Sequence, residues 1–455
     1  MTADVSITAA AAPSKAALGL GACTALVVGN MIGSGIFLLP SSLAAFGPIS
    51  LVGWVVTASG AMVLALVFGR LARVVPKTGG PYAYAREGFG DFAGFLIAWG
   101  YWIALWSGNA AVAVAFAGYL GFLVPTIGAS PLSGALAAVI AIWCLTFVNI
   151  RGVKEAGIVQ LFTTIVKLVP LLTLIIFGAA YIEPANYTPI NQSNETAFSA
   201  IAACAALTLW AFIGLESATV PAGEVVNPRR TIPMATIIGT AIAATVYIGV
   251  TFVALGVMPS DQLTGSTSPL ADVAFVMWGS LGAAFVALGA CISTFGTLNG
   301  FTMLTGQVPL AAARDGVFPS RFARLSSSGT PAFGLTFSNT LATVLILMSF
   351  SEGLAEQFEF IILLATLSTL VPYLVCALSE IMINVASRQS PMATLSPRLI
   401  ILAGIGFFYS LWAIYGAGPD VVFWGFLLLM LGLPVYVWLR AQHTPTEHME
   451  KDQHV

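Results

Sequence analysis

The sequence predicts an all-α polytopic membrane protein with about twelve transmembrane helices. Of the 455 residues, 58% are hydrophobic and only 8% are charged, whereas a soluble domain carries roughly 25% charged residues. The apolar residues gather in segments of about 20, the length that an α-helix needs to cross the hydrocarbon core of a bilayer. The lipid bilayer is therefore an expected partner, and no nucleic-acid partner is expected.

The segments between the apolar stretches alternate in charge along the chain. Loops on one side carry basic residues such as Arg70, Arg151 and Arg314, and loops on the other side carry acids such as Glu183 and Asp261. Because basic loops remain in the cytoplasm, both termini are predicted to be cytoplasmic. The short loops indicate a bacterial protein, so we expect a multi-pass protein of the inner (plasma) membrane. The predicted spans lie at about 17–42, 47–72, 92–120, 132–150, 157–181, 198–223, 232–257, 273–305, 331–350, 358–384, 398–416 and 419–440.

One transmembrane domain, 17–440, is expected between an N-terminal tail, 1–16, and a C-terminal tail, 441–455. The first residues lack the charged region and cleavage site of a secretory signal, so we expect the first span to be retained. The five cysteines are scattered through the apolar segments, and the three histidines all lie in the C-terminal tail. This pattern predicts neither a disulfide framework nor a metal site, and we expect no cofactor.

The middle of the first span contains Gly33, Ser34 and Gly35. Each glycine weakens a helix by about 1 kcal/mol relative to alanine, and non-helical backbone persists in a membrane only where protein buries it or where it lines a watery cavity. Unwinding here would leave free N–H groups at the start of a second half-helix, where the helix dipole favours an anion. We therefore expect a site for a substrate carboxylate. The alternative is a close helix–helix contact through small residues.

The sixth span contains Gly214 followed by Glu216 in an otherwise apolar run. Glu216 must be protonated, paired or exposed to water at this depth, and a glutamate that only hydrogen-bonds a neighbouring helix is the alternative. Interruptions in the first and sixth spans predict two inverted repeats, about 17–181 and 198–384, with a site between them near the midplane. The helices at 398–440 would then be accessory.

Lys167 lies near the middle of the fifth span. A charge at this depth costs several kcal/mol unless it is paired, and such residues mark functional sites. We expect its ammonium to meet carbonyls around 29–32 and hydroxyls such as those of Ser293 or Thr294. The alternative is a lysine that extends to the membrane interface.

Several motifs together resemble those of a known family. The chain is similar to the amino acid–polyamine–organocation superfamily over about residues 18–439, and within it to the bacterial arginine/agmatine antiporters. The resemblance implies a LeuT-like fold, in which five plus five helices form an inverted repeat and the substrate lies between spans one, three, six, eight and ten. The segments that carry the resemblance are 29–35 with 37–40, 79–86, 101–102 with 108–109, 209–210 with 212–218, 227–230, 315–319 and 370–373.

The resemblance also implies roles for single residues. The amides of Ser34 and Gly35 would hold the substrate carboxylate, and the carbonyls of Met31, Trp210 and Ile213 would accept the α-amino group. The Trp210 indole would lie along the substrate side chain, where a desolvated cation gains about 0.5–2 kcal/mol from the ring face. Asn109, with the carbonyls of Ala104 and Leu105, would meet a guanidinium. The residues that would close the inner side of the path are Tyr101, Glu216 and Tyr373.

The sequence departs from the family pattern at the distal end of this site. Phe301 replaces a second tryptophan and weakens the cation–π contact, while Ala365 replaces a serine and Leu105 a cysteine. Lys167 resembles a lysine that other branches of the superfamily place where sodium binds in sodium-coupled relatives. These changes make the distal pocket more apolar, so strict selectivity for arginine is not expected.

The leading functional prediction is secondary active transport that exchanges a cationic amino acid for a related amino acid or amine, as arginine/agmatine antiporters do. We also expect proton coupling and a homodimer. The first alternative is a proton-coupled or exchange permease for neutral amino acids. A channel or a sensor is the alternative from another class. An enzyme is not expected, because the sequence contains no nucleophile–base pair, metal cluster or cofactor motif.

Overall fold

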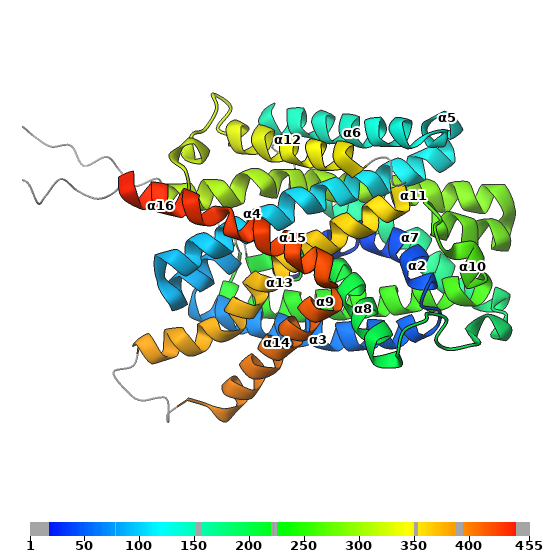
Figure 1. Cartoon of the computed structure of the whole chain (residues 1–455), viewed down its shortest axis with the longest axis horizontal. Helices are drawn as coiled ribbons and strands as arrows, with labels where there is room; N and C mark the ends of the chain where they lie inside the picture. Colours follow the sequence, from blue (N-terminus) through cyan, green and yellow to red (C-terminus); the bar gives the residue numbers. More distant parts are fainter. Residues whose placement is uncertain are drawn as a thin grey trace, which may run out of the picture.

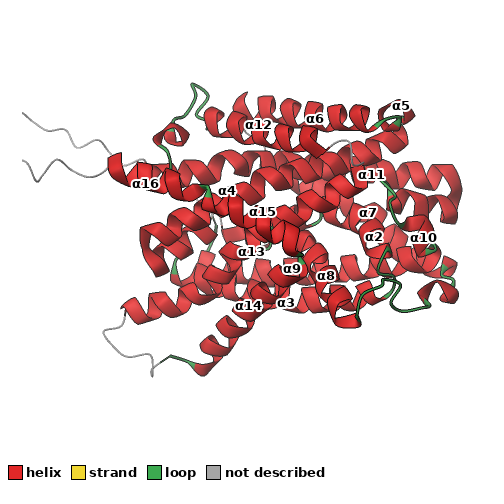
Figure 2. Ribbon diagram, in the orientation of Figure 1, coloured by secondary structure: helices red, strands yellow, loops and turns green. Residues whose placement is uncertain are grey.

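Apolar sequence folds into helices along nearly all of the described part of the chain (Figures 1 and 2). A helix satisfies its own backbone hydrogen bonds, which hydrocarbon requires of any segment that crosses a membrane. The computed structural model describes residues 18–77, 79–151, 156–219, 222, 225–349, 354–387 and 395–442, with side chains of 156–163 left out. The predicted terminal tails lie outside these residues, apart from 441–442.

The α-helices are α1 (Leu20–Met31), α2 (Ser34–Ala44), α3 (Ile49–Val74), α4 (Pro81–Leu123), α5 (Pro125–Gly128), α6 (Pro131–Arg151), α7 (Ala156–Gly178), α8 (Ala197–Leu209), α9 (Pro228–Val257), α10 (Ser260–Leu263), α11 (Pro269–Arg314), α12 (Ala332–Ser349), α13 (Leu354–Ser387), α14 (Pro397–Gly416), α15 (Pro419–Met430) and α16 (Gly432–Gln442). Short 3₁₀ turns are η1 (Ala179–Tyr181), η2 (Pro184–Tyr187), η3 (Trp210–Phe212), η4 (Ser217–Thr219) and η6 (Ser320–Ala323).

The protein is an all-α polytopic membrane protein. Among the described residues, 11 helical segments are long and apolar enough to cross a membrane. The predicted span 331–350 coincides with α12, whose apolar part, Ala332–Met348, is shorter than these 11. The total of twelve spans and the inverted repeat remain predictions.

α4 forms the centre of the bundle, where it packs most extensively against α13 and α11 (Figure 1). Most of α4 is buried, whereas the segment formed by α15 and α16 is mainly exposed on the outside. Both long helices are kinked at glycine, α4 at Gly90 (φ 83°) and α11 at Gly279 (φ 70°). The predicted third span, 92–120, begins just after the kink of α4 at Gly90. The predicted eighth span, 273–305, instead runs across the kink of α11 at Gly279.

Both predicted helix interruptions are confirmed. The first span is divided into α1 and α2, and the sixth is divided into α8 and the turns η3 and η4. The two interruptions lie against each other, because α1 packs against η4 and α2 packs against η3.

Candidate substrate site

The first interruption exposes the start of a helix inside the bundle. α1 ends at Met31 and α2 begins at Ser34, with Gly33 between them at φ −132° and ψ −135°, outside the helical region. No side chain caps the start of α2, so its first N–H groups lack an intrahelical partner. Ser34 and Gly35 are buried here, and their amides belong to the positive end of the α2 dipole.

The second interruption depends on Gly214, whose φ is 106°. A side chain would strain this conformation, which glycine adopts without cost. An added Cβ would also lie 3.1 Å from the Asn30 Cβ, so the turn approaches the end of α1 closely. Two side-chain hydrogen bonds join the interruptions: Asn30 Nδ2 donates to Ser217 Oγ at 2.8 Å, and Trp210 Nε1 donates to Ser34 Oγ at 3.2 Å.

The carbonyls predicted to accept an amino group lie at the same two turns. Gly33 N donates to Met31 O at 2.9 Å, and Ile213 N donates to Trp210 O at 3.1 Å. Each carbonyl oxygen has two lone pairs, so these two can still accept one hydrogen bond from a ligand. Both turns therefore have carbonyl acceptors, and η3 packs against α2.

An aromatic pair borders these turns. The rings of Trp210 and Phe301 have centroids 6.2 Å apart at an interplanar angle of 47°. Gly108 of α4 makes this arrangement possible, because an added Cβ would lie 2.8 Å from Trp210 Cη2 and 3.3 Å from Phe301 Cε1. The pair offers apolar faces to an alkyl chain and, on the indole, a π surface to a cation.

Glu216 joins α4 and α13 to the second interruption. Its carboxylate accepts hydrogen bonds from the Tyr101 hydroxyl of α4 at 2.6 Å and from the Tyr373 hydroxyl of α13 at 2.5 Å. The N–H of Gly214 adds a third, longer contact at 3.2 Å. Glu216 is 1% exposed, and these donors satisfy a buried carboxylate that would otherwise be costly. The predicted group of Tyr101, Glu216 and Tyr373 is thus brought together.

Lys167 of α7 is fully buried and contacts the first interruption. Its Nζ donates to the carbonyl oxygens of Gly29 at 2.8 Å and Ile32 at 2.9 Å, and lies 3.3 Å from Thr297 Oγ1. These contacts use all three donors of the ammonium. The predicted contact with carbonyls of 29–32 is confirmed, and the alternative in which the side chain extends to the interface is wrong, since its exposed fraction is 0%.

The predicted hydroxyl partners of Lys167 require a correction. Thr297, one turn beyond Ser293 on the same face of α11, meets the ammonium, whereas Ser293 Oγ lies 3.4 Å from the Ile32 carbonyl. Thr294 donates instead to the carbonyl of Ala290 within its own helix. The rotation of α11 about its axis decides which hydroxyl faces α7, and the sequence does not specify this rotation.

Asn109 of α4 follows Gly108, the residue that approaches the aromatic pair. Its Nδ2 donates to Asn339 Oδ1 at 2.6 Å and to Thr302 Oγ1 at 3.1 Å. Ala104 and Leu105 lie about one turn earlier on α4, and both are buried. Ala365 is buried in α13, which packs along α4.

Five polar residues of this region were not predicted as site residues. Each lies in an apolar span, where a buried hydroxyl or amide is costly unless it has a partner, and this is the signal that could have identified them. They are Asn30, Ser217, Thr297, Thr302 and Asn339.

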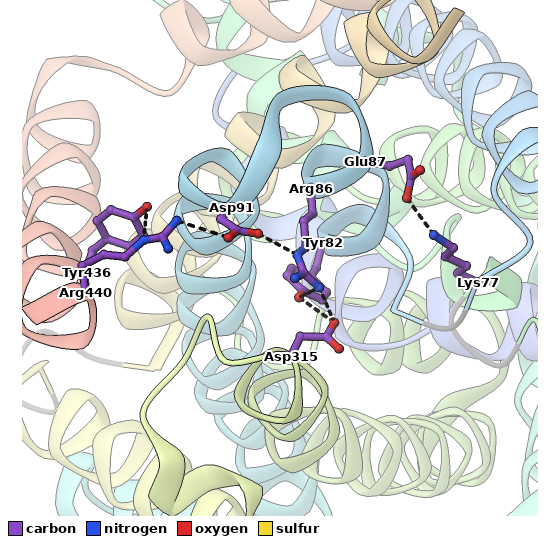
Figure 3. A network of polar contacts seen from close by, with 8 residues as sticks. All are labelled: Lys77, Tyr82, Arg86, Glu87, Asp91, Asp315, Tyr436 and Arg440. Carbon is purple, nitrogen blue, oxygen red and sulfur yellow. Dashed lines mark hydrogen bonds and ion pairs between the residues drawn. The ribbon is translucent and has the colours of Figure 1, made fainter. Parts of the chain in front are cut away.

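A second polar network lies at one end of the bundle and joins two motifs that are distant in sequence (Figure 3). At the start of α4, Tyr82 OH donates to Asp315 Oδ2 at 2.7 Å, and Arg86 pairs with the same carboxylate at 3.0 Å. Asp91 bridges Arg86 at 3.0 Å and Arg440 of α16 at 3.2 Å. The pairs are half-exposed, so each contributes at most about 1 kcal/mol. The network therefore links the start of α4 to the ends of α11 and α16.

Residues 18–427 match the family model described as amino acid permease. The chain belongs to the amino acid permease family. This permease is 34% identical to the putrescine transporter PotE of Haemophilus influenzae over 421 residues, which cover 92% of this chain and 96% of that protein. It is 37% identical to the cadaverine/lysine antiporter of Escherichia coli over 365 residues, which cover 78% of this chain and 81% of that protein.

Proposed function

We propose that this permease exchanges a cationic amino acid for the amine that remains after decarboxylation, by alternating access. The observation that carries the proposal is the meeting of the two helix interruptions, with Trp210 Nε1 3.2 Å from Ser34 Oγ. A positive helix end, carbonyl acceptors and an indole ring surround this point. The names of the relatives support the substrate class, because putrescine, cadaverine and lysine all carry an ammonium at the end of an alkyl chain.

The two substrates of such an exchanger differ by one carboxylate. The proposed site binds the carboxylate and the amino group through different backbone groups. The N–H groups at Ser34 and Gly35 would bind the carboxylate, which only the amino acid has. The carbonyls of Met31, Trp210 and Ile213 would bind the amino group, which both substrates have. One site can therefore hold either substrate in turn, as exchange requires.

The remainder of the substrate would extend along the aromatic pair. Trp210 and Phe301 would cover the alkyl chain, and the distal cation would reach Asn109 and the carbonyls of Ala104 and Leu105. Phe301 and Ala365 reduce the number of polar groups at this end. We therefore propose an ammonium or guanidinium as the distal group, with modest selectivity between them.

Glu216 and Lys167 have distinct roles in the proposed cycle. Glu216 would hold the inner side closed through Tyr101 and Tyr373, and a change in its protonation or partners would release it, which couples transport to protons. Lys167 would occupy the place of a metal cation beside the first interruption, so transport would not depend on sodium.

We also propose the inner membrane of a bacterium as the location, with both termini in the cytoplasm. The charge of the connecting loops supports this orientation. Each subunit of a homodimer would consist of one transmembrane domain, 17–440. This domain would contain repeats at about 17–181 and 198–384 and accessory helices at 398–440.

A permease for neutral amino acids is the second candidate. Phe301 and the buried, apolar Leu105 and Ala365 favour it, because an apolar distal pocket does not require a charged substrate. It differs from the leading proposal in the substrates that drive exchange.

Counterflow into proteoliposomes tests the proposal. Vesicles loaded with unlabelled lysine, ornithine, arginine, putrescine, cadaverine, agmatine or leucine are diluted into trace labelled lysine. Accumulation of label driven by the cationic compounds, and weakly or not at all by leucine, is expected. A parallel set of vesicles is diluted into trace labelled leucine, because a neutral permease would not carry the labelled lysine. Accumulation of labelled leucine in leucine-loaded vesicles, without accumulation of labelled lysine, would support the neutral permease, and accumulation of neither label would contradict both. A current through single molecules in planar bilayers would indicate a channel instead.

A further inference from the structure

Asn339 lies in the middle of α12, a helix that contributes none of the predicted substrate contacts. Its side chain is fully buried. An amide at this depth of an apolar helix is costly without partners, and both ends of this amide are engaged. Nδ2 donates to the carbonyl of Leu335 at 3.0 Å, and Oδ1 accepts from Asn109 Nδ2 at 2.6 Å.

These two hydrogen bonds fix the direction of a chain of amides. A backbone carbonyl can only accept, so the nitrogen of Asn339 must face Leu335 O and its oxygen must face Asn109. Asn109 must therefore direct its nitrogen toward Asn339, since two amide oxygens 2.6 Å apart would repel each other. The Asn109 nitrogen also meets Thr302 Oγ1 at 3.1 Å, so both of its hydrogens are in use.

The oxygen of Asn109 remains available for a ligand. Among the described residues its one polar contact is a long one, with Thr302 Oγ1 at 3.5 Å. The proposed function places Asn109 at the distal end of the substrate. Gly108, the residue before it, approaches Phe301 closely, since an added Cβ on Gly108 would lie 3.3 Å from Phe301 Cε1. Asn109 directly follows Gly108 in the sequence, and Thr302 directly follows Phe301.

From this geometry, and on the basis of the proposed function, we infer that Asn339 is a positioning residue that makes Asn109 present an acceptor to the distal end of the substrate. Ammonium and guanidinium groups have donors and no acceptor, so they match this oxygen. A carboxylate or carbonyl oxygen would be repelled by it, and a methyl group would leave it without a donor. The helix α12 thereby sets a specificity that the substrate-facing helices alone would not fix.

The effect of Asn339 can be measured as head-group discrimination, the ratio of the inhibition constants of norleucine and lysine in an exchange assay. Norleucine keeps the amino acid group and the alkyl chain and lacks the terminal ammonium. In Asn339→Leu, Asn109 loses its main acceptor and its amide can turn, so discrimination should fall about tenfold, which corresponds to about 1.4 kcal/mol. Asn339→Asp keeps an oxygen toward Asn109 and should retain most of the discrimination.

A matched control and a double variant separate positioning from a structural role. Asn149 Nδ2 of α6 donates to Asn299 Oδ1 of α11 at 2.8 Å, a second interhelical asparagine pair that includes neither Asn109 nor Thr302. Asn299→Leu should therefore leave discrimination unchanged. Because Asn339 acts through Asn109, adding Asn339→Leu to Asn109→Leu should cause no further loss of discrimination.

The outcomes are distinguishable. The inference is overturned if Asn339→Leu discriminates as the wild type does, if Asn299→Leu lowers discrimination equally, or if the losses add in the double variant. Should Asn339→Leu fail to reach the membrane, Asn339→Ala replaces it, and failure of both while Asn299→Leu folds would mark Asn339 as structural and also overturn the inference. A wild type that does not prefer lysine to norleucine would instead contradict the proposed function.

Discussion

Replacing Lys167 with alanine should slow transport strongly while leaving the protein folded. The ammonium donates to Gly29 O at 2.8 Å and to Ile32 O at 2.9 Å. In a continuous helix Gly29 O would accept from the N–H of residue 33, but Gly33 N donates to Met31 O. Lys167 is therefore the partner on which this carbonyl depends.

The magnitude follows from the carbonyls that the variant would leave behind. A buried polar group without a partner costs about 1–3 kcal/mol. Ile32 O would keep a contact with Ser293 Oγ at 3.4 Å, so we count only Gly29 O and expect a cost of about 2 kcal/mol. That energy corresponds to a factor of about 30 in an equilibrium constant, and we expect the exchange rate to fall by a similar factor because the interruption must hold its shape around the substrate.

The assay is exchange in proteoliposomes that contain equal amounts of folded protein, with thermal unfolding as the measure of stability. Lys77→Ala is the control: this lysine is 66% exposed and pairs with Glu87 at 2.8 Å, and a surface pair of this kind contributes little. Wild-type exchange should be the same in sodium and in choline. Wild-type exchange that requires sodium, or normal exchange by Lys167→Ala at every pH tested, would refute the reasoning.

The remaining predictions concern the substrate and the inner side of its path. Trp210→Leu should raise the dissociation constant of the substrate at least tenfold, about 1.4 kcal/mol, in a scintillation proximity assay, because the indole face covers the substrate chain. Phe301→Trp/Ala365→Ser should increase the preference for arginine over neutral amino acids in competition assays, because it restores a π surface and a hydroxyl at the distal end. Glu216→Gln should flatten the pH dependence of exchange, while binding changes only a few-fold, because the amide cannot ionise.

Each of these predictions has a result that would count against it. Unchanged binding by a folded, monodisperse Trp210→Leu protein would remove the indole from the site. If the wild type rejects every neutral amino acid more than about a hundredfold, roughly 2.7 kcal/mol, the interpretation of Phe301 and Ala365 is wrong. A Glu216→Gln protein with the pH profile of the wild type would exclude Glu216 from proton coupling.

The features that the sequence predicts correctly are those with a local cause. Glycine and serine within an apolar span weaken the helix where they stand, so the interruptions at Ser34 and before Glu216 can be located without a structure. A lysine at the depth of Lys167 must find oxygen atoms, and an interrupted helix nearby has free carbonyls to offer.

The features that the sequence does not predict depend on how distant helices pack. Ser293 and Thr297 are both plausible partners for Lys167 on chemical grounds, and only the rotation of α11 selects Thr297. Asn339 cannot be assigned to Asn109 before α12 is placed beside α4. The kink at Gly279 is equally hidden, because glycine is common within membrane helices that remain straight.

Efflux from proteoliposomes preloaded with labelled cadaverine measures the exchange of a cationic amino acid for its amine. We predict that label leaves rapidly when lysine is present outside, at one cadaverine for each lysine taken up, and that it stays inside when the outer buffer holds only leucine or no amino acid. Efflux at the same rate without an external cationic amino acid would contradict exchange.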